Sequence, residues 1–290
     1  MEQHRQTGQQ NIAVLLTCYN RKEKTKACIA SLAAAKEQML QEVPDGKYEL
    51  EFVVTDDNST DGTPDALQNL PYRIRLLQGN GQLFWCGGMN RSMGYVLKQP
   101  KSYQYVMFVN DDVCFYPDAL WRLFRRLECS DADIVVGSTV DSDGKMSYGG
   151  VKMVSRHFAR YQMIAPSEEP KVCDTFNGNC VLMATDTFCA LGRLDPAYIH
   201  SMGDFDYGMR AVRKGFKIVN CDAHIGKCDD NRVEGTWRDA SLPRKKRLAL
   251  KEGPKGLPKH DWYHFIRKNY GLLPACYHSI TPYIRILLAK

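Results

Sequence analysis

Two adjacent aspartates stand directly after an apolar segment in this chain of 290 residues. Residues 103–109 (YQYVMFV) are predicted to form a buried strand, and Asp111 and Asp112 follow it within VNDDV. Such a pair suits a hard divalent cation, because Mg²⁺ and Mn²⁺ take one or two carboxylates and keep other positions for phosphate oxygens. A solvated turn would explain an isolated pair equally well, so its meaning depends on what lies beside it.

A second polar cluster follows another apolar segment. Residues 48–55 (YELEFVVT) are predicted as a strand that stops at DDNSTDGT, residues 56–63. The polar side chains of this cluster can cap a helix that begins near Thr63, or a carboxylate among them can hold a nucleotide base. Either cluster alone is a weak signal, but two at the ends of neighbouring strands are much less expected by chance.

Two further segments carry candidate ligand-binding residues. Residues 79–94 (GNGQLFWCGGMNRSMG) are typical of a glycine-rich loop that lies close to a ligand and runs into a helix, although they match neither the Walker loop nor the dinucleotide fingerprint. Residues 203–207 (GDFDY) open a predicted helix, whose dipole favours a carboxylate at this end. Capping explains one of Asp204 and Asp206, but it does not explain both.

Strands and helices alternate over the first part of the chain. Strands are predicted at residues 12–17, 48–55, 73–77 and 103–109, with helices at about 24–39 and from near Thr63. This alternation predicts an α/β fold with a mostly parallel sheet covered by helices, whose ligands bind at the carboxyl ends of the strands. Residues 17–21, 56–61 and 110–112 all fall at that edge. Later elements are a strand at 134–139, an antiparallel excursion at 149–163, a strand within 175–183, a helix at 207–214 and a strand at 216–219.

The basic charge of the chain is concentrated at one end. The composition, 44% hydrophobic and 25% charged, is that of a globular protein and excludes disorder. Residues 232–290 contain 13 basic and 4 acidic side chains, a net charge of +9, whereas residues 1–231 carry a net −3. Aromatic residues and leucines interleave with these cations, which fits either a peripheral membrane segment or a helix pair packed on the body with a solvated basic face. Pro274 and Pro282 are expected to break any long amphipathic helix there.

The cysteines and the amino-terminal sequence indicate where in the cell the protein is expected. Eleven cysteines, an odd number without C-x-x-C spacing, indicate buried, reduced thiols of a cytosolic protein. The start MEQHRQTGQQ has no apolar core and is not a signal peptide, and no uncharged apolar run approaches the roughly 18 residues of a membrane span. We therefore expect a cytoplasmic protein, at most peripheral on the inner face of the cell membrane.

These motifs together resemble the inverting glycosyltransferases of family 2, which have the GT-A fold, and within them the bacterial rhamnosyltransferase-like branch that builds surface polysaccharides. The matching segments run in the family's order along nearly the whole chain: TCYNR (17–21), VVTDDNSTDGT (53–63), GNGQLFWCGGMNRS (79–92), VNDDV (109–113), FNGNCVLM (176–183), GDFDYGMRAVRKGFKI (203–218), His224 and WYHFIRKNYG (262–271). The resemblance implies a single GT-A domain over residues 1–231, with a nucleotide-sugar-binding half (11–112) and an acceptor-binding half (113–231). Residues 232–290 would form a helical extension.

The resemblance also implies roles for single residues. Asp112, assisted by Asp111, would bind Mn²⁺ or Mg²⁺, with His224 as a further ligand, although a lone histidine is more often structural. Asp204 would be the general base, with Asp206 as the alternative, because the family often has Glu-Asp where this chain has Gly203-Asp204. Residues expected to bind the nucleotide sugar are Thr17, Tyr19, Asn20, Arg21, Asp57, Gly81, Trp85, Asn90 and Asp111. Trp85 would pack on a sugar face or, equally, in the core.

The expected reaction moves a sugar from a UDP- or dTDP-sugar to a hydroxyl of a glycan or of a polyprenyl-diphosphate-linked acceptor, with inversion. One rival is a sugar nucleotidyltransferase, but TCYNRKEKT (17–25) has no glycine where such enzymes carry a basic glycine-rich loop. A second is a non-catalytic sugar- or nucleotide-binding relative, which the joint presence of these aspartates and His224 disfavours. Nucleic-acid binding is not expected, because the body is slightly acidic.

Overall fold

The computed structural model describes residues 9–44, 46–155, 158–230 and 233–288. Its main sheet has nine strands in the order β3-β2-β1-β4-β11-β6-β12-β5, with β7 paired to β6. Strands β1, β2, β3 and β4 run parallel, as do β6 and β12, whereas β11 is antiparallel to both β4 and β6. The prediction of a mixed, mostly parallel sheet is confirmed. The strand bounds are β1 Gln10–Cys18, β2 Tyr48–Asp56, β3 Ile74–Gln78, β4 Tyr105–Val109, β5 Cys114–Phe115, β6 Ile134–Val140, β7 Met146–Tyr148, β11 Cys180–Ala184 and β12 Ile218–Lys227.

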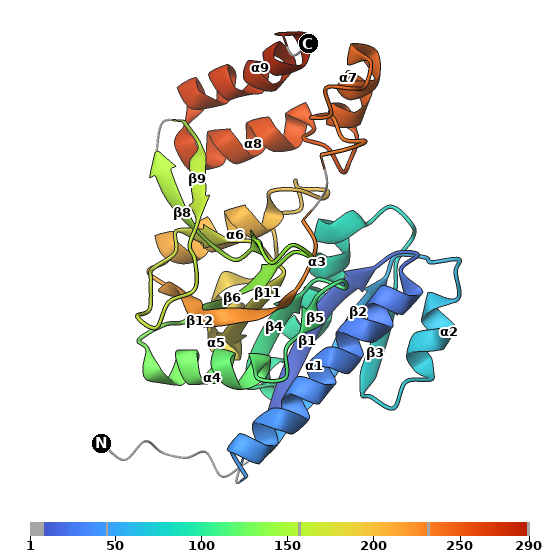
Figure 1. Ribbon diagram of the computed structural model, residues 1–290, viewed down its shortest axis with the longest axis vertical. Helices are drawn as coiled ribbons and strands as arrows, with labels where there is room; N and C mark the ends of the chain where they lie inside the picture. Colours follow the sequence, from blue (N-terminus) through green and yellow to red (C-terminus); the bar gives the residue numbers. More distant parts are fainter. Residues whose placement is uncertain (1–8, 45, 156–157, 231–232, 289–290) are drawn as a thin grey trace.

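Helices cover both faces of this sheet (Figure 1). Their bounds are α1 Lys22–Glu42, α2 Thr63–Gln68, α3 Phe84–Leu97, α4 Ala119–Cys129, α5 Thr185–Leu191 and α6 Gly203–Arg213. Side chains of β1 alternate between two cores: Ile12, Val14 and Leu16 pack with α1 and α4, whereas Ala13 and Leu15 pack with α3, α5 and α6. A strand buried on both faces reads as a continuous apolar run, which explains IAVLLT.

A smaller sheet carries β10 Thr175–Phe176, β8 Gly150–Ser155 and β9 Arg160–Met163, in that order and with antiparallel pairing. This sheet is the excursion expected at residues 149–163. It lies between the main sheet and the carboxyl-terminal helices in Figure 1.

The carboxyl-terminal segment forms three helices, α7 Arg244–Glu252, α8 Lys259–Tyr270 and α9 Leu272–Leu288, which stand together at one end of the molecule (Figure 1). Phe265 and Ile266 of α8 are fully buried in the same core as β1 and α3. The Lys268 ammonium lies 2.7 Å from carboxylate oxygens of both Asp195 and Asp206. The predicted boundary at residues 231–232 lies outside the described residues, and the helices beyond it share the core of the body.

Helix α9 continues through Pro282, so the expected break at the prolines was wrong. A proline inside a helix leaves the carbonyl four residues earlier without its N–H partner. Here that carbonyl, of His278, accepts hydrogen bonds from Trp262 Nε1 at 2.9 Å and Thr281 Oγ1 at 3.2 Å. Because side chains replace the missing donor and Pro282 itself is buried, the helix tolerates the proline. Pro274 lies in the first turn, where no N–H partner is required.

Replacing Phe265 should destabilise the whole protein. We expect Phe265→Ala to lower the free energy of unfolding by about 3–5 kcal/mol, because it leaves a cavity in the shared core. Urea denaturation followed by circular dichroism and tryptophan fluorescence measures this change. Leu273→Ala, at a position that is 83% exposed on α9, is the control and should change it by less than about 0.5 kcal/mol. A Phe265→Ala protein whose tail unfolds in a separate transition, with the body unchanged, would contradict a shared core.

Candidate active site

The polar clusters predicted at strand ends lie at one edge of the main sheet. Strands β1, β2 and β4 are adjacent and parallel, so the residues that follow Cys18, Asp56 and Val109 emerge at the same edge. Thr17, near the end of β1, donates a hydrogen bond through its hydroxyl to the Thr55 carbonyl at 3.1 Å. Tyr19 is 49% exposed at this edge. The topology thus brings together segments that are far apart in sequence.

Asn20 links the loop after β1 to the loop after β2. Its side-chain oxygen accepts a hydrogen bond from Thr60 N at 2.8 Å, and its backbone N–H donates to Ser59 Oγ at 2.8 Å. Its φ of 51° lies in the left-handed region, which asparagine tolerates better than most residues. Asn20 therefore fixes the loop after β2 against the loop after β1.

Asp57 organises the glycine-rich segment. One of its carboxylate oxygens accepts from Gly81 N at 2.8 Å, and the other accepts from Leu83 N at 2.9 Å and Phe84 N at 3.1 Å. The side chain is buried, and Gly81 has a φ of +85°, which favours glycine. Three N–H groups bound to one carboxylate hold this loop and the start of α3 in place. The sequence predicted a base-binding role for Asp57, and the structure adds this structural role.

Arg21 bridges the two aspartates that follow β4. Its Nη1 lies 2.7 Å from Asp111 Oδ1, and its Nη2 lies 2.9 Å from Asp112 Oδ2. Asp111 is almost fully buried and also accepts from Thr25 Oγ1 at 3.3 Å. Burial raises the pKa of Asp111 to about 6, and the Arg21 guanidinium opposes this rise. The bridge allows two adjacent carboxylates to remain close together in a partly buried site.

The donor set of this pair fits a divalent cation. Two carboxylates from adjacent residues are hard oxygen ligands, and the Asp112 side chain keeps 21% of its surface exposed toward solvent. Cys228, directly after β12, also contacts Asp112, with its Sγ 3.4 Å from Asp112 Oδ1. Within the described ranges, no group of three or more histidine, cysteine or acidic side chains is arranged to hold a metal.

Among the described residues, His224 forms no cluster of three or more candidate metal ligands with the aspartates. Its Nδ1 lies 3.0 Å from Ser138 Oγ, and burial lowers its pKa. This contact gives His224 a structural role on β12, and its metal-ligand role stays a prediction. The register of β12 against β6 shifts on both sides of His224, so its side chain cannot be placed by simple strand alternation.

Asp204 lies at the start of α6, beside the turn between β10 and β11. Its Oδ2 accepts from Gly178 N at 2.9 Å, and burial raises the pKa of its carboxyl above the usual value. A Cβ atom at Gly178 would lie 2.7 Å from the Trp85 ring and 3.3 Å from Asp204, so glycine is required where these groups meet. Trp85 Nε1 in turn donates to Asn110 Oδ1 at 2.8 Å, next to Asp111. This chain of contacts connects Asp204 to the aspartate pair.

Asp206 has a different environment from Asp204. It has no exposed surface, and its carboxylate is bound by Lys268 Nζ at 2.7 Å and Asn269 Nδ2 at 3.2 Å, both from α8. The sequence left open whether Asp204 or Asp206 is the general base, and the structure gives the two different environments. Asp204 lies beside Trp85, whereas Asp206 joins the body to the carboxyl-terminal helices. Asn90, on α3, has a buried side-chain oxygen without a protein partner.

Sequence reasoning missed several residues of this site. Thr25, Asn110, Gly178 and Cys228 all contact its aspartates or Trp85. Asn110 and Gly178 lie inside motifs that the sequence singled out, VNDDV and FNGNC, and their positions were a usable signal. No motif in the sequence marked Thr25 or Cys228 as site residues, because their contacts depend on how α1 and the end of β12 pack against the site.

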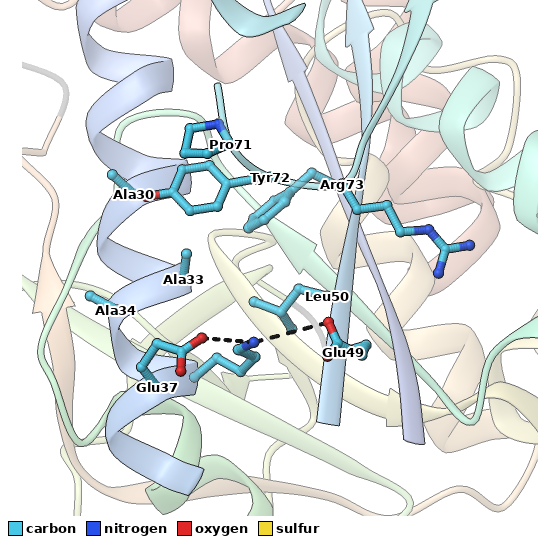
Figure 2. A pocket seen from close by; sticks show the side chains of 11 residues that line it. Ala30, Ala33, Ala34, Glu37, Glu49, Leu50, Pro71, Tyr72 and Arg73 are labelled. Carbon is cyan, nitrogen blue, oxygen red and sulfur yellow. Dashed lines mark ion pairs between the residues drawn. The ribbon is translucent and has the colours of Figure 1, made fainter. Parts of the chain in front are cut away.

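A separate pocket of about 310 Å³ lies between α1 and the first residues of β2 (Figure 2). Lys36, one of the residues that line it, forms ion pairs with Glu37 at 2.8 Å and Glu49 at 4.0 Å. Glu49 and Leu50 lie near the start of β2, which begins at Tyr48, whereas the aspartate clusters follow the carboxyl ends of the strands. The pocket is therefore at the opposite edge of the sheet from the candidate active site.

Comparison with solved structures defines the class of fold. The chain is similar to S. aureus TarS 1–349 in complex with UDP-GlcNAc, with a TM-score of 0.54, 15% identity, and coverage of 96% of this chain and 71% of that one. It is also similar to the mannosyltransferase PcManGT from Pyrobaculum calidifontis in complex with GDP-Man and Mn²⁺, with a TM-score of 0.54, 14% identity, and coverage of 98% and 74%. The fold is thus that of the GT-A glycosyltransferases.

The family follows from the sequence match. The model of glycosyl transferase family 2 matches residues 13–183, more than half of the chain, so the chain belongs to this family and is a glycosyltransferase. A curated relative, the N-acetylglucosaminyl-diphospho-decaprenol L-rhamnosyltransferase of Mycobacterium tuberculosis, is 24% identical over 234 residues, which are 72% of each chain. The resemblance drawn from the sequence motifs is confirmed at the level of family and fold.

Removing the Asp57 carboxylate should loosen the glycine-rich loop. Asp57→Ala leaves three buried or half-buried N–H groups without their charged acceptor, and we expect a loss of about 3 kcal/mol in the free energy of unfolding. Asp57→Asn keeps one acceptor oxygen and should lose less. Asp143→Ala, an exposed aspartate on another loop, is the matched control. Equal unfolding free energies for Asp57→Ala and Asp143→Ala would contradict the structural role of Asp57.

Proposed function

We propose that this glycosyltransferase moves a sugar from a nucleotide-diphosphate sugar to a hydroxyl of a lipid-linked or glycan acceptor, with inversion, in the synthesis of a cell-surface polysaccharide. The observation that carries the proposal is the contact chain from Asp204 through Gly178, Trp85 and Asn110 to the Asp111–Asp112 pair. It joins a carboxylate suited to accept a proton to carboxylates suited to a diphosphate-bound cation. The M. tuberculosis relative is named for a polyprenyl-diphosphate acceptor, which supports the same acceptor class here.

The donor would bind along the edge formed by β1 and β2. Thr17 lies near the end of β1, and Tyr19, Asn20 and Arg21 follow this strand. Asp57, which follows β2, accepts from Gly81 N at the same edge. Three of the Asp57 acceptor positions are taken by backbone N–H groups, which leaves room for one more donor such as a base N–H. UDP and dTDP both present such an N–H. The similar structure of S. aureus TarS, in complex with UDP-GlcNAc, supports a uridine or thymidine donor.

Asp112 and Asp111 would hold Mn²⁺ or Mg²⁺, and Arg21 would release one or both carboxylates toward it. When bound, such an ion neutralises charge on the departing nucleotide diphosphate. The guanidinium of Arg21, half-exposed beside the pair, is then available to a phosphate oxygen. Mn²⁺ in the PcManGT structure supports a divalent cation, and the carboxylate donors of this chain fit one.

Asp204 would act as the general base. An acceptor hydroxyl must lose a proton as it attacks the anomeric carbon, and a carboxylate with a raised pKa accepts that proton more readily. The Gly178 N–H holds Asp204 in place, and Trp85 borders it on the side toward Asn110. A single displacement with one base inverts the configuration of the sugar. A nucleotidyl transfer would break a phosphate bond instead, and its product would keep the sugar phosphate.

A nucleotide screen tests the donor site. We expect UDP or dTDP with Mn²⁺, at about 100 times the dissociation constant, to raise the Tm by roughly 5 °C, because a ligand of the native state stabilises it. In Asp112→Ala the part of the shift that depends on Mn²⁺ should disappear, whereas Asp143→Ala should keep it. A wild-type protein that gives no shift with any nucleoside diphosphate would refute the proposed donor class.

A pH profile tests the base. Turnover should fall as the pH falls through the pKa of Asp204, which burial raises above 3.8, because only the ionised carboxylate accepts the proton. Asp204→Asn should lower turnover by about 10²–10⁴-fold and should remove the fall of turnover at low pH. Turnover is measured as nucleoside diphosphate released in the presence of acceptor. Asp143→Asn controls for a change of net charge. Full turnover in Asp204→Asn would show that another group is the base.

A further inference from the structure

Helix α9 presents a row of large apolar side chains that the rest of the described chain leaves uncovered. Leu273, Tyr277, Ile280, Ile284 and Leu287 are 83%, 59%, 58%, 45% and 52% exposed. Their spacing of three and four residues places them on one side of the helix. Ala275, His278, Pro282 and Ile286 form the opposite side and are buried against the molecule. We call the exposed row the α9 outer face.

The outer face lies at an extremity of the molecule. In Figure 1, α8 lies between α9 and the sheet, and α9 with α7 forms the end farthest from the amino terminus. A surface at such an extremity can meet a flat partner without interference from the body. Isolated exposed leucines are ordinary, but a contiguous apolar row of this length marks an interaction surface.

Cations accompany the apolar row. Helix α9 contains Arg285 and, from Leu272 to Leu288, no acidic residue. Helix α7 lies beside its carboxyl-terminal half, with Lys251 Nζ 4.1 Å from the centre of the Tyr283 ring and Arg247 Nη1 3.5 Å from the Ile286 carbonyl. Arg244, Lys245 and Lys246, at the start of α7, are exposed. An apolar helical face with neighbouring cations is complementary to the headgroup region of an anionic bilayer.

We propose that the α9 outer face, together with the exposed cations at the start of α7, docks the protein onto an anionic lipid surface. The helix would lie in the plane of the interface, since no helix among the described residues is long and apolar enough to cross a membrane. A second copy of the chain fits less well, because a symmetric dimer would place the same basic patch of each copy against the other. Docking would give the enzyme access to a membrane-borne acceptor, and this benefit rests on the proposed function. The docking itself does not rest on it.

Vesicle binding tests the proposal with the full chain. We expect it to co-sediment with phosphatidylcholine vesicles that contain phosphatidylglycerol, and to bind pure phosphatidylcholine much less. Ile280→Asp/Ile284→Asp should lower the partition coefficient at least about tenfold, because two anchoring side chains become anions. The matched control is Val154→Asp/Val172→Asp, which places the same charges on valines of the body that are 60% and 47% exposed. Lys245→Glu/Lys246→Glu should weaken binding to the anionic vesicles only.

Equal vesicle binding by wild type and Ile280→Asp/Ile284→Asp would overturn the proposal. So would a dimer in sedimentation that this variant dissociates, because the outer face would then be a self-association surface. The nucleotide-dependent Tm shift, measured on the same variants, separates this proposal from the proposed function. Vesicle binding without any nucleotide shift would refute the proposed donor class and leave docking intact, whereas a normal shift without vesicle binding would refute docking alone.

Discussion

The site depends on keeping several carboxylates close together at one edge of a sheet. Buried negative charges are unfavourable unless each finds a donor, and the chain supplies a different donor for each. Arg21 bridges Asp111 and Asp112, backbone N–H groups bind Asp57, and the Gly178 N–H binds Asp204. These donors come from segments after β1, β3 and β10, so the strand order of the sheet is what makes the charge arrangement stable.

The carboxyl-terminal helices belong to this arrangement as well. Lys268 of α8 neutralises Asp206, one turn of helix or less from the proposed base, and Asn269 holds the other oxygen of the same carboxylate. The basic tail and the slightly acidic body are therefore joined by an ion pair whose carboxylate, Asp206, is buried, and part of the tail's charge is used inside the fold. Arg285 on α9 and the exposed cations at the start of α7 lie near an apolar helix face at the end of the molecule, and for these we propose a second role at an anionic surface.

The sequence alone predicted the strands that end in polar clusters, because a strand buried on both faces leaves an unbroken apolar run such as IAVLLT. It could not separate Asp204 from Asp206, since the burial of Asp206 depends on α8, which is distant in sequence. It could not place His224, because β12 shifts register on both sides of that residue. The continuity of α9 through Pro282 was equally hidden, as it depends on the Trp262 side chain of a neighbouring helix.

We propose that sugar transfer is a single displacement in which Asp204 accepts a proton while the Asp111–Asp112 pair faces the leaving diphosphate. The anomeric configuration of the product tests it most directly. With the donor that the nucleotide screen selects, the one-bond carbon–proton coupling at the anomeric centre of the product should report the configuration opposite to that of the donor. Retained configuration would require two displacements and a covalent nucleophile or an equivalent intermediate, and would contradict a single displacement with Asp204 as the base.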